Sequence, residues 1–310
     1  MTVLTNRPQR MSALRRREAV AGYLFVLPWI LSLLIFTTYP ILASFYFSLT
    51  DYTVVEAPKW IGLENYRTVA DIDPSFWTAV YNSAYYAFIS VPVGLIVSLG
   101  LALVLNMQAT GIGLYRTLFY LPSLAPPVAG TIIFIVMFNS EGGLVNQLLQ
   151  AVGLPGPGWF TDPVWAKPGL IILSLWGVGV GTLTFLAGLK EIPQSLLEAA
   201  GIDGANRWQK FRHVTLPLLT PVTLFNLVMG VINSFQVFTS AFVIGGTTGK
   251  PIESTLMYMV LIYRNAFRYF KMGYASTLSV LMFVVILMVT LSIFRSARLW
   301  VFQESDEPAA

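Results

Sequence analysis

Cysteine is missing from this 310-residue chain, and histidine occurs once, as His213. Disulfide frameworks, thiol nucleophiles and metal sites built from cysteines or several histidines are therefore excluded, and no metal site is expected. Charge is also scarce, because Asp, Glu, Lys and Arg together make up 11% of the residues. Water-soluble domains carry about a quarter charged residues, so most of this chain must face something other than water.

The sequence contains six long uncharged stretches. They cover residues 23–49, 80–105, 117–138, 169–189, 214–244 and 274–294, and every Lys, Arg, Asp and Glu lies outside them. Each reaches the roughly 20 residues that a helix needs to cross about 30 Å of hydrocarbon, where a charge costs about 2.5–3.5 kcal/mol or more. The sequence predicts an all-α integral membrane protein with six transmembrane helices in the lipid bilayer. The first stretch is too long for a cleaved secretory signal and is expected to be a retained span.

The distribution of charge between the stretches predicts the orientation. Positive residues favour the cytoplasmic side, and they gather in the N-terminal arm, in the links after the second and fourth stretches, and in the tail. Residues 50–79 are mainly acidic and residues 139–168 nearly neutral, so both links are expected outside. This predicts a cytoplasmic arm (1–22), a membrane domain (23–298) and a cytoplasmic tail (299–310) in a bacterial cell (inner) membrane. Beyond the arm no basic cluster favours a nucleic-acid partner, and none is expected.

One link disagrees with this orientation. Residues 245–273 carry Lys250, Arg264, Arg268 and Lys271, yet they must be external if there are six spans. Part of the link, residues 255–263, is apolar, and a crossing there would change the topology. So short a run is more often interfacial or re-entrant than spanning, and the sequence leaves this point open.

Prolines are expected to bend or break several spans, because each removes a backbone donor. They are Pro28, Pro40, Pro92, Pro122, Pro126, Pro127 and Pro221. Two interpretations stay open, ordinary proline usage in membrane helices and hinging during alternating access.

The fourth link, residues 190–215, has the pattern of two short helices. Ser195 and Glu198 have the spacing of a capping box, which predicts a helix start there. Gly204 tolerates the left-handed conformation that ends helices, and a second helical piece is expected at residues 205–213. Thr215 and Pro217 are expected to cap and start the fifth span. Such an element would present a compact protrusion to a partner on the cytoplasmic face.

The same link matches a known family motif. Glu198, Ala199, Ala200, Gly204, Val214, Leu216 and Pro217 stand at the spacing E-A-A-x3-G-x9-I-x-L-P, with valine in place of isoleucine. This resembles the "EAA" loop of binding-protein-dependent ABC importer permeases. Residues 233–238, 245–246 and 272–276 further resemble the carbohydrate-uptake branch, the maltose- and glycerol-phosphate-type permeases.

The resemblance implies that the chain is a permease subunit of an ATP-driven importer for a sugar or related polyol. The short helix would be a coupling helix that docks on a cytoplasmic ATPase, with Glu198 capping its own helix or pairing with the ATPase. The implied ATPase-coupling residues are Glu198, Ala199, Ala200, Gly201, Ile202, Asp203, Gly204 and Ala205. The implied partners are a second homologous permease subunit, two ATPase subunits that bind ATP and Mg, and an extracytoplasmic solute-binding protein. This chain itself would be no enzyme and would hold no cofactor.

The fifth stretch carries the candidate solute pathway. Asn226, Gly230, Asn233 and Val237 share one helix face, and such a stripe either lines a wet cavity or bonds to a neighbouring helix. The candidate pathway residues are Asn226, Asn233, Phe235, Gln236 and Phe238, the aromatic ones available to stack on a sugar ring. Gly177, Gly181 and Gly188 in the fourth stretch fit close helix packing better than binding.

Two other classes of function remain as alternatives. A secondary, ion-coupled transporter usually places ionisable residues in the membrane, and these stretches have none. Sodium coupling through backbone carbonyls needs no such residue, so that class is disfavoured without being excluded. A membrane enzyme would bring together paired acids or a nucleophile with its base, and the sequence offers no such group.

Overall fold

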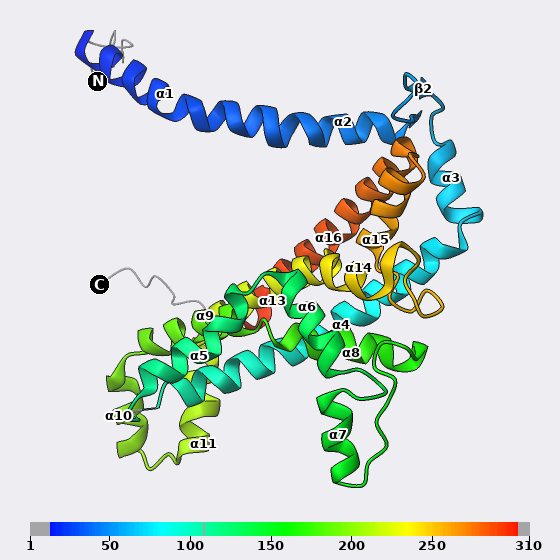
Figure 1. The fold of residues 1–310 in the computed structure, drawn as a ribbon. Helices are drawn as coiled ribbons and strands as arrows, with labels where there is room; N and C mark the ends of the chain where they lie inside the picture. Colours follow the sequence, from blue (N-terminus) through cyan, green and yellow to red (C-terminus); the bar gives the residue numbers. More distant parts are fainter. Residues whose placement is uncertain (1–12, 108, 303–310) are drawn as a thin grey trace.

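The computed structural model describes residues 13–107 and 109–302, and nearly all of the regular structure in them is helical (Figure 1). Two strands, β1 (Thr50–Asp51) and β2 (Lys59–Trp60), pair antiparallel in a short ribbon. Within the described residues four helices are long and apolar enough to cross a membrane, or up to six if each of two bent pairs forms one span. The helical membrane fold is thus confirmed, and the bent pairs allow the predicted six spans.

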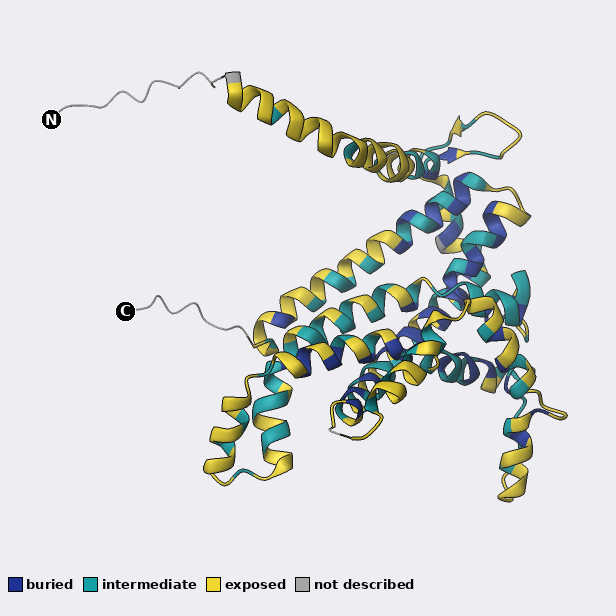
Figure 2. Cartoon of the chain, turned by 60° about the vertical axis from the view of Figure 1, so that its left-hand side comes forward, coloured by how far each residue is buried: buried dark blue, intermediate teal, exposed yellow. Residues whose placement is uncertain are grey.

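The first span is a rod whose earlier part, α1 (Ala13–Leu33) and the π-helical η1 (Leu34–Thr38), stands apart from the other helices. Its later part, α2 (Tyr39–Ser48), follows without a break. The apolar window of the rod is 0% buried inside the chain, and Figures 1 and 2 show it leaving the bundle as an exposed arm. α2 packs on α16 (Met272–Trp300), where the rings of Phe45 and Phe283 meet edge to face.

The second span, α4 (Pro74–Leu105), is the central helix of the bundle. It begins where Asp73 accepts a hydrogen bond from the backbone of Ser75 at 3.0 Å, with Pro74 in the first turn. It continues unbroken past Pro92 and packs against α8 (Pro163–Leu175), α9 (Gly179–Glu191) and α13 (Thr220–Phe235). α4 therefore forms one wall of whatever space lies between these helices.

The third, fourth and fifth spans are each interrupted. α5 (Ile112–Leu124) and α6 (Pro127–Met137) meet at 99°, and α8 and α9 meet at 47°. In the fifth span, α13 ends at Phe235 and α14 (Thr239–Gly245) begins after residues 236–238. A helix can be interrupted inside a membrane only where its freed backbone groups face protein or a cavity, so these breaks point to the interior of the bundle.

Proline accounts for only one of these breaks. Pro126 and Pro127 separate α5 from α6, and Ala125 and Pro126 adopt extended backbone there. In contrast, Pro28, Pro92 and Pro122 stand inside helices that continue past them. The chain thus breaks at the Pro126–127 pair as predicted, whereas the helices do not break at those three prolines.

The link between the third and fourth spans holds a short helix beside the bundle. α7 (Leu144–Ala151) lies between α6 and α8, and Figure 1 shows it projecting away from the bundle. The buried Asn146 fixes it, since its Oδ1 accepts from Trp159 Nε1 at 2.8 Å and its Nδ2 donates to the Pro157 carbonyl at 3.1 Å. This link, for which the sequence predicted only an external position, is therefore partly helical and packed.

The apolar run at residues 255–263 is a buried structural element of the protein. α15 (Tyr258–Tyr263) continues into the π-helical η4 (Arg264–Arg268) and packs against α4 and α16. Leu256, Met257 and Leu261 are at most 1% exposed. Six residues of α-helix cover only about 9 Å, so α15 is no transmembrane span. Residues 255–263, whose position the sequence left open, are thus packed within the protein and do not form a further span.

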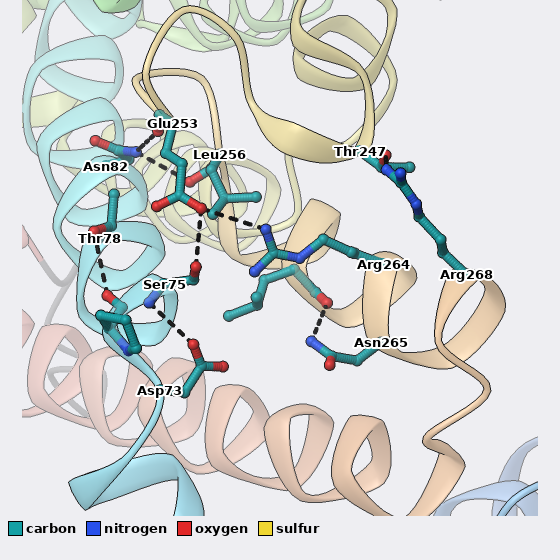
Figure 3. A network of polar contacts seen from close by, with 12 residues as sticks. Asp73, Ser75, Thr78, Asn82, Thr247, Glu253, Leu256, Arg264, Asn265 and Arg268 are labelled. Atoms are coloured by element: carbon teal, nitrogen blue, oxygen red, sulfur yellow. Dashed lines mark hydrogen bonds and ion pairs between the residues drawn. The ribbon is translucent and has the colours of Figure 1, made fainter.

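Hydrogen bonds tie this element to the start of α4, as Figure 3 shows. Asn82, which is 2% exposed, donates from Nδ2 to the carbonyl oxygens of Glu253 at 2.8 Å and Leu256 at 3.1 Å. The Glu253 carboxylate accepts from Ser75 Oγ at 2.9 Å and pairs with Arg264 at 3.4 Å. The segment before α15 is thereby fixed to the second span.

The phenol of Tyr258 completes the contact with the sixth span. Its hydroxyl donates to the Leu278 carbonyl at 2.9 Å, and its backbone N–H donates to Ser83 Oγ at 2.9 Å. Burial raises the pKa of Tyr258, because the charged phenolate would lose its hydration. The side chain therefore stays a neutral donor at physiological pH.

Candidate functional site

The link between the fourth and fifth spans forms two helices at one end of the bundle. α10 (Gln194–Ile202) and α11 (Arg207–Lys210) lie side by side in Figure 1, far from the β1–β2 ribbon. α11 continues through the π-helical η2 (Phe211–Thr215) and α12 (Leu216–Leu218) toward α13. The two helices predicted for this link are present.

The turn between the two helices is closed by a glycine. Gly204 has φ +80°, which L-residues other than glycine rarely adopt. The backbone N–H of Ala205 donates to the Ala200 carbonyl at 2.9 Å, and that of Gly204 donates to Gly201 at 3.1 Å. These two bonds form a Schellman motif. The predicted role of Gly204 as the helix terminator is confirmed.

The capping of these helices differs from the prediction in two places. α10 begins after Pro193 with no side-chain cap, so the predicted capping box of Ser195 and Glu198 is wrong. A capping box forms instead at α11, where Asn206 Oδ1 accepts from Gln209 N at 2.9 Å and Gln209 Oε1 accepts from Asn206 N at 2.8 Å. Both sites fit the spacing rule, and Pro193 already starts α10 by its restricted backbone.

The predicted start of the fifth span is also corrected. Thr215 has helical backbone angles and makes no side-chain cap, because the helix runs through it from η2 into α12. The regular helix of the span starts afresh at Thr220, whose Oγ1 donates to the Pro217 carbonyl at 2.6 Å. The same Oγ1 accepts from the backbone of Phe302 at 2.8 Å, which ties the end of α16 to this point.

The α10–α11 pair exposes large apolar side chains that nothing in the described chain covers. Ile202 is 88% exposed and Leu196 44%, while Trp208 on α11 is 65% exposed and stacks beside Phe211. Within the described residues Glu198 makes no hydrogen bond or ion pair, and its side chain is exposed. An exposed apolar helix of this kind is typical of a surface that another protein covers.

A cavity of ≈ 400 Å³ opens between α4, the break of the fourth span, and α13. Its polar lining comes from Ser90 and Ser98 of α4, Ser174 and Thr184 of the fourth span, and the amides of α13. Gly177, Gly181 and Gly230 supply part of the wall without side chains. This is a mixed surface of hydroxyl, amide and apolar groups of the size of a small-molecule site.

A second cavity of ≈ 250 Å³ adjoins the first. The two share Ser174, Gly177 and Val180 in their linings, so they meet at the break between α8 and α9. The second cavity is also lined by residues 122, 123 and 125–127 at the α5–α6 break and by Thr239 and Ser240 after the α13 break. Residues at or next to all three helix interruptions therefore line this second cavity.

The candidate pathway residues divide into two groups. Asn226 and Asn233 line the larger cavity with Gly230 and Val237, so the predicted shared face does front a cavity. Asn226 Nδ2 donates to the Val222 carbonyl of its own helix at 3.1 Å, so this bond links no neighbouring helix.

The other three candidates lie elsewhere. Phe235, Gln236 and Phe238 are absent from the linings of the two cavities just described. Phe235 and Phe238 pack against the hydrophobic core, and the Phe238 ring stacks on Phe242. Any contact of these residues with a solute stays a prediction. The wall hydroxyls of α4, α8 and α9 were missed, although isolated serines and threonines in apolar stretches were a usable signal.

The glycines of the fourth span support close helix packing. A methyl group on Gly188 would lie 2.7 Å from Cγ2 of Val222 on α13, and one on Gly181 would lie 3.0 Å from Oγ of Ser98 on α4. Gly179 faces the backbone of α5 in the same way. Gly177 differs, because it lies in both cavity linings.

Comparison with known proteins adds a family relationship. Residues 90–301 match the family model described as "Binding-protein-dependent transport system inner membrane component". The chain is 42% identical to the probable ABC transporter permease protein YesP of Bacillus subtilis, covering 94% of this chain and 95% of the relative. It is 37% identical to the lactose transport system permease protein LacF of Rhizobium radiobacter, covering 91% and 95%.

The fold has a counterpart among solved structures. A chain from the crystal structure of a bacterial alginate ABC transporter, in complex with alginate pentasaccharide-bound periplasmic protein, superimposes with a TM-score of 0.80. The sequence identity is 24%, and the superposition covers 91% of this chain and 95% of that chain. This similarity shows a shared fold.

Proposed function

This chain belongs to the family of binding-protein-dependent transport system inner membrane components, and on that premise we propose that it is the permease subunit of an ATP-driven importer for a sugar or related polyol. Relatives that match nearly its whole length are named as permeases for lactose and for trehalose and maltose. The cavities fit such a solute, because hydroxyls and amides can exchange hydrogen bonds with sugar hydroxyls. Family membership disfavours the rival, an ion-coupled secondary transporter.

The observation that carries the proposal is a helical path from α10 to the cavity. The exposed α10 packs against α11 and η2, and the helix continues from α11 to α12. Thr220 then starts α13, which places Asn226 and Asn233 in the cavity wall. A partner that moves α10 would thus displace the wall of the cavity. We assign coupling to the second half of α10 and its turn, from Glu198 to Ala205, most of which is exposed.

The energy source lies in other subunits under this proposal. ATP and Mg would be held by two cytoplasmic ATPase subunits, one of which receives α10, and a second homologous permease subunit would complete the pore. An extracytoplasmic solute-binding protein would deliver the solute to the opposite face. Both chain termini and α10 would then be cytoplasmic, and the β1–β2 ribbon and α15 would be external.

The proposal is tested by a charge placed on α10. Ile202→Glu is expected to abolish co-purification of the cognate ATPase, because burying an isoleucine stabilises a contact by about 1.5–3 kcal/mol, a factor of roughly 10 to 150 in affinity. Ile252→Glu is the matched control, since Ile252 is 87% exposed against 88% for Ile202 and lies in the segment before α15. ATPase retention by Ile202→Glu equal to that of Ile252→Glu would refute the assignment.

A further inference from the structure

A separate cavity of ≈ 580 Å³ lies at the end of the bundle away from α10. One wall comes from the connection between the first and second spans, which includes α3 (Glu64–Asp71), and the other from η4 and the start of α16. A backbone bridge between Thr53 and Lys271 and the 2.7 Å hydrogen bond from Tyr274 to Asp73 join the two walls. The cavity is therefore built by packed segments and is distinct from the two cavities inside the bundle.

A buried cation with spare hydrogen-bonding capacity lines this cavity. Arg264 is 8% exposed, and its one ion pair, to Glu253, has a length of 3.4 Å. Its Nε–H is buried and has no hydrogen-bond partner among the residues that the structure describes. A buried donor left unpaired costs about 1–3 kcal/mol. Because the Nε atom itself is inaccessible, Arg264 acts on a ligand through its positive charge beside the cavity.

The remaining polar groups of the cavity include both hydrogen-bond donors and hydrogen-bond acceptors. Asp51 and Glu64 contribute exposed carboxylates that accept hydrogen bonds, while Lys271 contributes an exposed ammonium group that donates them. Asn265, which is 6% exposed, donates from Nδ2 to the Leu261 carbonyl at 2.9 Å. Its side-chain oxygen, Oδ1, remains as an acceptor. A ligand that fits such a lining must both donate and accept.

The charged and aromatic side chains of the lining restrict the class of ligand further. The ionisable acids in the lining, Asp51, Glu64 and Asp73, outnumber its bases, Arg264 and Lys271. An anion would be repelled by the carboxylates and a cation by the guanidinium and ammonium groups, whereas neutral hydroxyls can pair with both. The tyrosines at positions 52, 269 and 274 add aromatic faces, against which the C–H face of a sugar ring can pack.

We propose that this cavity is a binding site for a neutral saccharide of one or two rings, a place where the solute is held before it enters the bundle. The volume lies within the range of about 300–1,000 Å³ that is typical of small-molecule sites. The assignment rests on the proposed function, because only an importer with this cavity on its external face would meet its solute there.

The test measures saccharide binding without ATP or partner subunits. The full-length chain in lipid nanodiscs is examined by saturation-transfer NMR with glucose, galactose, arabinose, maltose and lactose as probes. At least one sugar is expected to give a signal that Thr68→Trp abolishes by filling the cavity. Arg67→Trp is the matched control, because Arg67 lies on the same helix and is exposed outside the lining. Absence of signal from all five sugars, or a signal that survives Thr68→Trp, would overturn the assignment.

One further variant and one further ligand address folding and charge. Glu64→Gln keeps the shape of an exposed position, so it replaces Thr68→Trp if that variant does not fold, and about tenfold weaker binding is expected from one lost charge-assisted hydrogen bond. Glucuronate is expected to bind more weakly than glucose, and the reverse order would contradict the neutral-ligand assignment.

An inner-cavity variant separates this proposal from the transport function. If sugar binding disappears in Asn233→Leu and persists in Thr68→Trp, the sugar binds only in the inner cavity and the present assignment fails, while the proposed transport function stands. If Ile202→Glu leaves ATPase retention unchanged and Thr68→Trp removes the sugar signal, the coupling assignment fails and the outer binding site stands.

Discussion

Asn82 should be among the most sensitive single positions for the stability of the protein. The change Asn82→Ala removes the donor of the bonds to the Glu253 and Leu256 carbonyls and the acceptor for Lys167 Nζ at 3.2 Å. The Glu253 carbonyl still accepts from the backbone N–H of Leu256 at 3.0 Å, so the main loss is the buried bond to the Leu256 carbonyl, at about 1–3 kcal/mol. With roughly 2–4 °C for each kcal/mol in domains of about 150–250 residues, the midpoint of thermal unfolding should fall by about 2–12 °C.

The measurement is fluorescence-monitored thermal unfolding of purified variants in one detergent. Thr78→Ala is the matched control, since Thr78 lies one turn away on α4, is only partly buried, and its side chain bonds only its own helix, at Pro74. It should change stability by no more than about 0.5 kcal/mol. Asn82→Asp isolates the donor, because it keeps an acceptor for Lys167 and should be as destabilised as Asn82→Ala. An Asn82→Ala midpoint equal to that of the control would show that these bonds do not hold the segment before α15.

The other predictions concern backbone packing and the cavity. Gly188→Ala should destabilise the protein by about 1–3 kcal/mol through the clash with Val222, whereas Gly100→Ala, with open space around it, should be neutral or stabilising by up to about 1 kcal/mol; thermal unfolding of both compares them, and equal shifts would contradict the packing. Gly204→Ala should cost about 1–2 kcal/mol at its left-handed backbone and weaken ATPase retention, and normal co-purification would count against the turn. Asn233→Leu should slow solute uptake by vesicles of the assembled transporter while ATPase retention stays normal, and unchanged uptake would place the pathway elsewhere.

The long spans were predictable because the bilayer penalises charge, and runs of about 20 residues without a charge can be recognised in the sequence itself. The uncharged windows at residues 80–105 and 274–294 fall within α4 and α16. The predicted ends of these helices were less accurate, since a helix continues into polar sequence as long as its polar groups find hydrogen-bond partners. α4 starts earlier, at the cap made by Asp73, and α8 includes Lys167, whose ammonium group reaches Asn82.

The breaks and the buried α15 could not be read from local patterns. The interruptions at residues 176–178 and 236–238 contain no proline, and contacts with other spans decide where a helix of ordinary composition stops. The burial of Leu256 and Met257 likewise depends on α4, which is distant in sequence. For the site, the α10 turn was predicted because Gly204 is a local requirement. Of the cavity residues, only the stripe on one helix was visible, since the facing hydroxyls come from other spans.

The exposed arm that precedes the contact of α2 with α16 has a consequence for how the protein is made. Since its apolar window draws no burial from the later helices, it can enter the bilayer as soon as it leaves the ribosome, before any of its companions exist. Substitutions of one apolar residue by another in this arm should be tolerated in related sequences. A single charged residue near its middle would instead raise the free energy of membrane insertion by about 2.5–3.5 kcal/mol. Scanning the arm with arginine in a translocon insertion assay would show that penalty rising toward the centre.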